Sequence, residues 1–222
     1  MIRFLLIILF LFAGASHADP KDDAIQELLT QFDAANGDID KLIAVRYALD
    51  EALLITALKG LDNNNLPSFG TGDTVIYEFS DYQCGYCRRM FPVVDAAAEN
   101  GKATVKLIEF PILGELSTLA ASYALAAAKQ GRYVEFHRQL MSGDRLNEDH
   151  IIAAAQDAGL NLDQLHQFID SPEMQEQLDN NYRLAALLGV NGTPAFIING
   201  NLYPGALQAE DFNSLLTPQA TQ

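Results

Sequence analysis

The sequence predicts an α/β fold with a helical insertion, preceded by an N-terminal α-helical extension. Three observations predict it. A β-branched strand pattern, an amphipathic helix and a second strand pattern follow one another between residues 74 and 110. Residues 115–190 then carry only helical patterns, and two short strands separated by Asn199-Gly200 come after them. The β-α-β order implies parallel strands with a right-handed crossover, and the C-terminal hairpin adds an antiparallel pair.

The first 18 residues have the pattern of a secretory signal peptide. One basic residue, Arg3, precedes an apolar run over residues 4–12 that is too short to span a bilayer. Small side chains at Ser16 and Ala18 occupy the −3 and −1 positions of a cleavage site. We therefore expect a protein that is exported to the periplasm and cleaved after Ala18. The alternative is an uncleaved anchor, which would leave the protein associated with the membrane.

Residues 19–61 are predicted to form two amphipathic helices. The first ends near Asn36-Gly37, and the second begins with Asp38 as its cap and ends near Gly60. Neither helix has an obvious core of its own, so each apolar stripe needs a partner surface. We expect homo-oligomerisation through this segment, with packing on the chain's own C-terminal domain as the alternative. The stripes consist of Ile25, Leu28, Leu29, Phe32, Ile39, Leu42, Leu49 and Leu53.

A polar linker containing Gly and Pro, residues 62–73, separates this segment from a C-terminal domain over residues 74–222. The domain is expected to begin with a strand, the helix that starts at Cys84, and a second strand. The predicted strands cover residues 75–79, 103–110, 195–198 and 201–204. The helices predicted after the second strand cover residues 116–130, 133–141, 148–158, 162–169, 173–188 and 209–216.

Charge and cysteine content limit the possible functions. The chain has 14 Lys and Arg residues against 29 Asp and Glu residues, a formal net charge of −15, so a nucleic-acid partner is not expected. Its two cysteines, Cys84 and Cys87, are three positions apart, and a disulfide between them would close almost no loop. In an exported chain this pair indicates redox chemistry rather than a structural crosslink.

A Cys-x-x-Cys motif at the start of a helix supplies what thiol–disulfide exchange needs. The helix N-terminus favours a thiolate on Cys84, the nucleophile, and Cys87 lies one turn further on as the resolving thiol. A structural zinc site needs four ligands, but there is no second such motif, and His137, His150 and His166 all lie in the insertion. Cu(I) held by the two thiolates, with or without a second chain, is the metal-binding alternative.

Two further positions are candidates for the site. Glu78 lies six residues before Cys84 on a strand that is buried on at least one face, where desolvation would raise its pKa and let it exchange a proton with Cys87. The alternative is a glutamate at the strand edge that faces water. Thr193-Pro194 precedes the next strand, and an X-Pro bond is the one linkage where a cis peptide costs little, although the sequence alone favours a trans turn. If Pro194 lies near Cys84, a cis bond would present the Thr193 backbone to an extended substrate segment and keep metal from the cysteines.

These motifs resemble the DsbA-like branch of the thioredoxin superfamily over residues 74–216. The resemblance rests on residues 78–87, on residues 110–114 before an Ala-rich helix, and on residues 192–196. It implies a thioredoxin fold that contains the insertion and needs no cofactor. It also implies roles for four site residues. These are Cys84 as the exposed nucleophile, Cys87 as its buried partner, Glu78 as the buried acid and Pro194 as a cis-proline.

The sequence departs from the strongly oxidising members of that branch. Gly85-Tyr86 between the cysteines lacks their histidine and Thr193 precedes the proline, both of which are similar to DsbC-type isomerases. Residues 20–60 resemble the N-terminal extension of suppressor-of-copper-sensitivity and outer-membrane-associated relatives, some of which form oligomers. Tyr86 is a candidate substrate contact. Whether Tyr82, Tyr86 and Phe196 form the rim of a peptide groove or simply pack is open at this point.

The expected function is a periplasmic thiol:disulfide oxidoreductase with isomerase or reductase character. Its partners would be unfolded or wrongly disulfide-bonded secreted proteins and a membrane redox protein that resets the dithiol. A monomeric DsbA-like dithiol oxidant is one alternative. A Cu(I)-binding copper-tolerance protein that uses the same thiolates is an alternative of another class.

Overall fold

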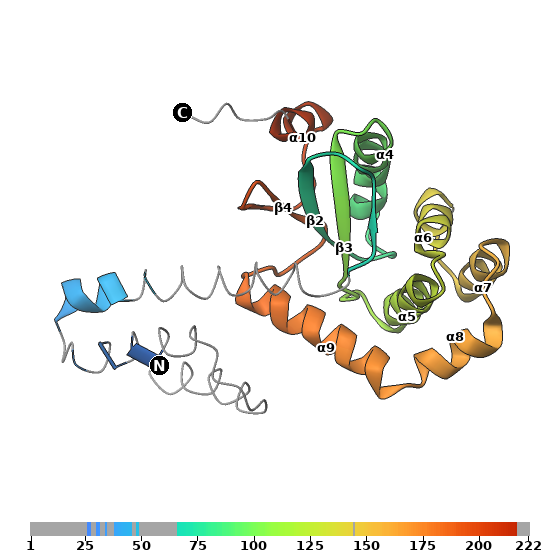
Figure 1. The fold of residues 1–222 in the computed structure, drawn as a ribbon, viewed down its shortest axis with the longest axis horizontal. Coiled ribbons are helices and arrows are strands. Elements are labelled where there is room, and N and C mark those ends of the chain that lie inside the picture. Colours follow the sequence, from blue (N-terminus) through green and yellow to red (C-terminus); the bar gives the residue numbers. More distant parts are fainter. Residues whose placement is uncertain are drawn as a thin grey trace. The chain divides into compact units, whose positions relative to one another are not determined.

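The computed structural model describes residues 66–143 and 145–216, together with residues 26, 27, 30, 31, 34, 38–45 and 48 of the N-terminal part. The chain divides into two compact units, Met1–Gly60 and Leu61–Gln222. The predicted signal peptide lies outside the described residues. Figure 1 shows the chain as a ribbon, with labels on the helices of the second unit and on its central strands.

In the first unit, the described residues include the start of the second predicted helix. Residues 39–45 are helical, and the Asp38 carboxylate accepts a hydrogen bond from the Lys41 backbone N–H at 3.2 Å. Asp38 therefore caps this helix, as the sequence predicts. Ile39 and Ile43, one turn apart, are 70% and 48% exposed. Two large apolar side chains thus lie side by side on the exposed surface of this helix.

The second unit is built on a five-stranded sheet with the order β1-β3-β2-β4-β5. β2 (Thr74–Ser80) pairs in parallel with β3 (Ala103–Glu109) and antiparallel with β4 (Ala195–Ile198). β4 pairs antiparallel with β5 (Asn201–Pro204). Both the parallel pair and the C-terminal antiparallel pair agree with the sequence prediction.

The first strand was not expected. The sequence analysis assigns residues 62–73 to a linker, whereas β1 (Ser68–Phe69) lies within it and pairs antiparallel with β3. The Phe69 side chain is buried, and its ring lies 6.0 Å from that of His137. A strand of two residues shows no alternating pattern, so only the tertiary contacts of Phe69 identify it.

The helices of the second unit form two groups (Figure 1). α4 (Gly85–Glu99) connects β2 to β3 and packs against α10 (Ala209–Leu215). Five helices form the insertion between β3 and β4, and the last of them also contacts β3. This arrangement is the predicted thioredoxin fold with a helical insertion. The insertion consists of α5 (Glu115–Lys129), α6 (Tyr133–Ser142), α7 (Glu148–Asp157), α8 (Leu162–Ile169) and α9 (Pro172–Leu187).

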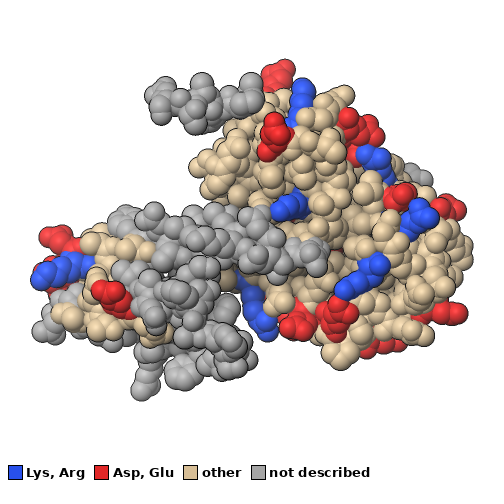
Figure 2. All heavy atoms as spheres, viewed as in Figure 1, with Lys and Arg blue, Asp and Glu red and all other residues tan. Residues whose placement is uncertain are grey.

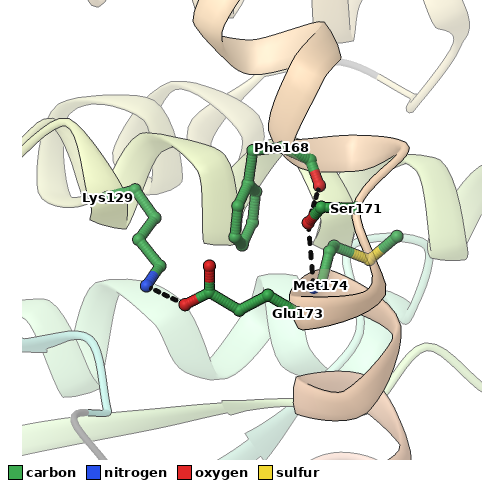
Figure 3. Close-up of polar contacts among 5 residues, drawn as sticks. All are labelled: Lys129, Phe168, Ser171, Glu173 and Met174. Carbon is green, nitrogen blue, oxygen red and sulfur yellow. Dashed lines mark hydrogen bonds and ion pairs between the residues drawn. The ribbon is translucent and has the colours of Figure 1, made fainter.

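The junction between α8 and α9 is drawn in Figure 3. Ser171 caps α9, since its hydroxyl accepts a hydrogen bond from the Met174 N–H at 3.3 Å and donates one to the Phe168 carbonyl at 2.6 Å. Lys129, the last residue of α5, forms an ion pair with Glu173 and lies over the Phe168 ring. These contacts hold the start of α9 beside the end of α5, and α9 then carries the chain back to the sheet.

One face of the sheet packs against α4. Side chains alternate along a strand, so Ile76, Glu78 and Ser80 of β2 share a face, as do alternate residues of β3 that include Glu109. Apolar residues of this face form one hydrophobic cluster with α4 and α10. The cluster includes Ile76, Val105, Leu107, Phe196, Ile198, Met90, Val94 and Phe212. Two carboxyl groups therefore lie on the same face as the main core.

On the face drawn in Figure 2, acidic and basic side chains of the second unit are interspersed and form no basic patch. Within the described residues, every helix is too short or too polar to span a membrane.

Candidate active site

Cys84 is the N-cap residue of α4. Its sulfur accepts a hydrogen bond from the Cys87 backbone N–H at 3.4 Å, and its own N–H donates to the Asp81 carbonyl at 3.0 Å. The first turn of α4 contains no acidic residue. The unpaired N–H groups and the positive end of the helix dipole therefore act on the Cys84 sulfur without a competing anion.

The structure brings Thr193 and Pro194 to the dithiol, although they lie about 110 positions away in the sequence. The Thr193–Pro194 peptide bond is cis. In its protonated form the Cys84 thiol donates a hydrogen bond to the Thr193 carbonyl at 3.2 Å. Pro194 therefore lies near Cys84, as its predicted role requires.

The exposure of Cys84 differs from what the resemblance implies. It implies an exposed nucleophile, but Cys84 is only 6% exposed, while Cys87 is fully buried. The physical reason is the close approach of the Thr193 carbonyl to the Cys84 sulfur on one side and of the first turn of α4 on the other. A substrate disulfide therefore has access to a small part of the sulfur only.

The two thiols have opposite proton affinities. A hydrogen bond from the Cys87 thiol is the main cause that lowers the pKa of Cys84 to about 5, despite burial. Hydrogen bonds from the Thr193 side chain and from the backbone N–H groups of Cys87 and Tyr86 add to this effect. Burial raises the pKa of Cys87, and the Cys84 sulfur and the Glu78 charge raise it further. At neutral pH the site therefore holds a thiolate on Cys84 and a thiol on Cys87.

Glu78 lies on the face of β2 that packs against α4. It is 3% exposed and is opposite Leu107 on β3 and Phe196 on β4. Burial raises its pKa to about 8, the Ser80 side chain opposes this shift, and the negative charge of Cys84 adds to it. The predicted effect of desolvation on Glu78 is therefore present. A carboxyl with this pKa can both accept and donate a proton near neutral pH.

Asp81 is a site residue that the sequence analysis missed. Its Oδ1 accepts hydrogen bonds from the Gln83 N–H at 2.8 Å and the Ser117 hydroxyl at 2.7 Å, and its Oδ2 accepts one from the Leu113 N–H at 3.0 Å. Asp81 thus ties the loop before Cys84 to α5 and to the loop after β3. The Asp-x-Gln turn pattern was the available signal for its local contact, because Asp often bonds the N–H two residues on.

A second missed group is a buried polar cluster next to the dithiol loop. Glu109 Oε1 accepts hydrogen bonds from the hydroxyls of Tyr133 at 2.6 Å and Tyr82 at 3.1 Å. The Tyr82 hydroxyl also lies 2.9 Å from Nδ1 of His137. His137, considered above only as a zinc ligand, is instead enclosed by aromatic rings. Within the described residues, no group of three or more His, Cys, Asp and Glu side chains could hold a metal ion.

Residues 75–217 match the family model described as a DSBA-like thioredoxin domain. The chain belongs to the DSBA-like thioredoxin family. Within that family, it is 35% identical to a thioredoxin-like oxidoreductase from Silicibacter pomeroyi DSS-3, with a TM-score of 0.65 over 70% of this chain and 92% of the other.

Two further proteins are similar to this chain over part of its length. The catalytic domain of Proteus mirabilis ScsC is 25% identical, with a TM-score of 0.66 over 74% of this chain and 94% of that domain. A Na(+)/H(+) antiporter NhaA 3 from Salinispora tropica is 26% identical over 139 residues, which are 61% of this chain. The match spans 21% of the antiporter, so the similarity covers about a fifth of that protein.

The aromatic residues around the DSBA-like dithiol fall into two classes. Tyr82 and Phe196, left open in the sequence analysis, are buried and pack in the core. Tyr86 is 57% exposed, and the Arg89 guanidinium lies 4.4 Å from its ring centroid. Only Tyr86 of the three is therefore available to a partner, and Leu113, whose N–H bonds Asp81, is exposed as well.

We expect the reduced DSBA-like domain to show a thiolate titration with a midpoint near pH 5. The pKa of Cys84 is lowered to about 5, mainly by the Cys87 thiol, whereas the thiol of Cys87 keeps its proton well above neutral pH. The thiolate absorbs in the ultraviolet, so its absorbance can be followed from pH 3 to pH 9. Cys84→Ser should abolish the transition, and a midpoint near the value for free cysteine, about 8.5, would contradict the prediction.

Proposed function

We propose that this chain is a periplasmic thiol:disulfide oxidoreductase that acts on disulfides of exported proteins, with isomerase or reductase character. The observation that carries the proposal is the placement of Cys84. Its sulfur caps α4 and lies 3.2 Å from the Thr193 carbonyl of the cis-proline loop. The Cys84 sulfur is therefore stabilised as a thiolate by the helix start, and it also lies beside a backbone segment that can pair with an extended substrate.

In the reductive direction the reaction has two exchange steps. The Cys84 thiolate attacks one sulfur of a substrate disulfide, forms a mixed disulfide and releases the other sulfur as a thiolate. Cys87 then loses its proton to the Glu78 carboxylate and attacks the Cys84 sulfur. The second substrate thiolate leaves, so the substrate gains two electrons and the protein keeps a Cys84–Cys87 disulfide. The same steps in reverse oxidise a substrate dithiol, with Glu78 returning the proton to Cys87.

The surface around Cys84 suits an extended, unfolded chain. A pocket that includes Thr193, whose carbonyl approaches the Cys84 sulfur, is lined by residues of the cis-proline loop and of β5, among them Pro194, Leu202 and Pro204. An apolar side chain next to the substrate cysteine fits this mixed lining. Tyr86 and Leu113 add exposed apolar surface. This surface can contact the apolar side chains that an unfolded substrate exposes and a folded one buries.

Isomerase or reductase character is supported by the dipeptide Gly85-Tyr86. Without a histidine beside Cys84, the thiolate lacks one stabilising partner, so the dithiol should be a weaker oxidant than a Cys-Pro-His-Cys protein. The exposed pair Ile39 and Ile43 supports self-association through the N-terminal segment. An oligomer with several dithiols would hold a substrate while its disulfides are exchanged. A membrane redox protein would reset the dithiol.

The test compares the chain without its signal peptide with a version that also lacks residues 19–61. Both would be assayed for insulin reduction and for reactivation of scrambled ribonuclease, with Cys84→Ser as the inactive control. We expect both versions to reduce insulin, but only the longer one to reactivate scrambled ribonuclease and to migrate as an oligomer. Equal reactivation by the two would show that residues 19–61 are not needed and would favour a monomeric oxidoreductase, and no exchange by either would contradict the proposed function.

A further inference from the structure

Glu109 is a second buried carboxyl that the proposed exchange reaction does not use. It lies at the end of β3, where its Oε1 accepts two tyrosine hydrogen bonds. Its Oε2 has no hydrogen-bond partner among the described residues, although the atom is fully buried. Burying a carboxylate oxygen without a partner is costly, so such a group calls for an explanation beyond packing.

The groups that face Glu109 do not offset a negative charge. Burial and the charge of Arg138 lower the pKa of His137 to about 3, so this ring is neutral. Burial also raises the pKa values of Tyr82 and Tyr133 well above their ordinary value. From α9, Asn181 donates a hydrogen bond at 2.9 Å to the backbone carbonyl of Glu109, not to its side chain. The facing groups that can be charged are the acids Glu78 and Asp81.

Glu109 and Glu78 lie on the same face of adjacent parallel strands. Ser80 is the register partner of Glu109, and Glu78 precedes Ser80 by two positions, so the two acids are diagonal neighbours. Ser80, whose side chain opposes the rise in the Glu78 pKa, lies on the same face of β2 as Glu78. Burial raises the pKa of Glu109 to about 8, the hydrogen bonds from Tyr133 and Tyr82 lower it, and the charges of Asp81 and Glu78 raise it.

We propose that Glu109 is a second proton-holding acid of the dithiol site, which shares one negative charge with Glu78 and thereby sets the pH at which Glu78 becomes a base for Cys87. This inference rests on the proposed function, because it needs Glu78 to accept the Cys87 proton. Glu109 touches neither sulfur and acts through Glu78, so it is a positioning residue.

The consequence follows from like-charge repulsion. When either carboxyl has lost its proton, its charge opposes ionisation of the other, so the pair loses its two protons in two separate steps. During the first step the charge resides on Glu109 for part of the time. When Glu109 is replaced by a neutral residue, the first proton lost can come only from Glu78. Glu78 then ionises at lower pH.

The test measures the rate at which Cys87 resolves a mixed disulfide between Cys84 and glutathione, as a function of pH, in the full chain. For Glu109→Gln we expect the midpoint of the rate profile to move to lower pH by about one unit, a tenfold change in proton affinity. Glu109→Asp, which keeps the acid, should restore the profile in part. In a Glu78→Gln background the pH-dependent acceleration should be lost, and adding Glu109→Gln should change nothing further.

A second readout does not depend on turnover. The infrared carbonyl band of protonated carboxylic acids should disappear in two steps as the pH of the wild-type protein rises, and in one step in Glu109→Gln. Urea unfolding of each variant separates loss of stability from a change in the profile. An unmoved rate profile together with a one-step loss in wild type would overturn the inference alone. No effect of Glu78→Gln would overturn the role of Glu78 in the proposed function, and this inference with it.

Discussion

Replacement of Cys87 by alanine is expected to stop turnover and to leave the protein trapped in a mixed disulfide with its substrate. Cys87 is buried in the first turn of α4, directly beside the Cys84 sulfur, so it resolves the intermediate within the same molecule. Well-oriented intramolecular reactions reach effective molarities of ~10⁵ M and above. We therefore expect turnover to fall by about a thousandfold or more.

The trapped species can be measured as a mass increase, reversible by dithiothreitol, after reaction with a disulfide-bonded protein. Cys84→Ala is the matched control and should form no adduct. Because the Cys87 thiol is the main cause of the low Cys84 pKa, the variant should also react more slowly below pH 7. Sustained turnover without an adduct would show that Cys87 is not the resolving thiol.

Glu78→Gln should stabilise the reduced protein at neutral and alkaline pH. The pKa of Glu78 is raised in the folded state from 4.5 to about 8, mainly by burial. A carboxyl whose pKa is raised in the folded state contributes fully to the free energy of unfolding below the pKa that it has in the unfolded chain. That contribution is lost as the pH rises through the pKa of the folded state. Between pH 4 and pH 7 the Glu78 carboxyl should therefore lower the free energy of unfolding of the wild type by on the order of 3 kcal/mol. The neutral glutamine makes no such change.

Urea unfolding of both proteins at pH 4, 7 and 9 checks this prediction. The two unfolding free energies should be similar at pH 4 and should diverge as the pH rises, with the variant the more stable. Glu176→Gln, at an exposed position of α9, is the matched control and should follow the wild type. A difference that does not change with pH would show that the Glu78 carboxyl is not held neutral by its surroundings.

The sequence predicts the elements that have a regular pattern. β2 and β3 are apolar, β-branched runs, and the helices of the insertion have helical spacing and end at glycines such as Gly131 and Gly159, both with positive φ. The redox motif could be identified because two cysteines only three positions apart close almost no loop, and Glu78 because a carboxyl is unusual on a buried strand. These features are local, and a single sequence contains them.

Features that depend on tertiary contacts could not be predicted in the same way. Glu109 appears in the sequence as the polar end of a strand, and only the register with β2 places it on the face of Glu78. The role of Asp81 requires Ser117 and Leu113, which lie more than 30 residues away. The low exposure of Cys84 depends on Thr193, whose carbonyl approaches it only because β4 pairs with β2.

The hydrogen bonds from the insertion to Asp81 and Glu109 bear on attempts to shorten this protein. Ser117 of α5 and Tyr133 of α6 bond the two carboxyl groups that flank the dithiol loop. A minimal version reduced to the sheet, α4 and α10 would leave both carboxyls without these donors. An engineer who removes the insertion would therefore have to redesign the surroundings of Asp81 and Glu109 together, since these carboxyls would keep only the hydrogen bonds from the Gln83 N–H and the Tyr82 hydroxyl.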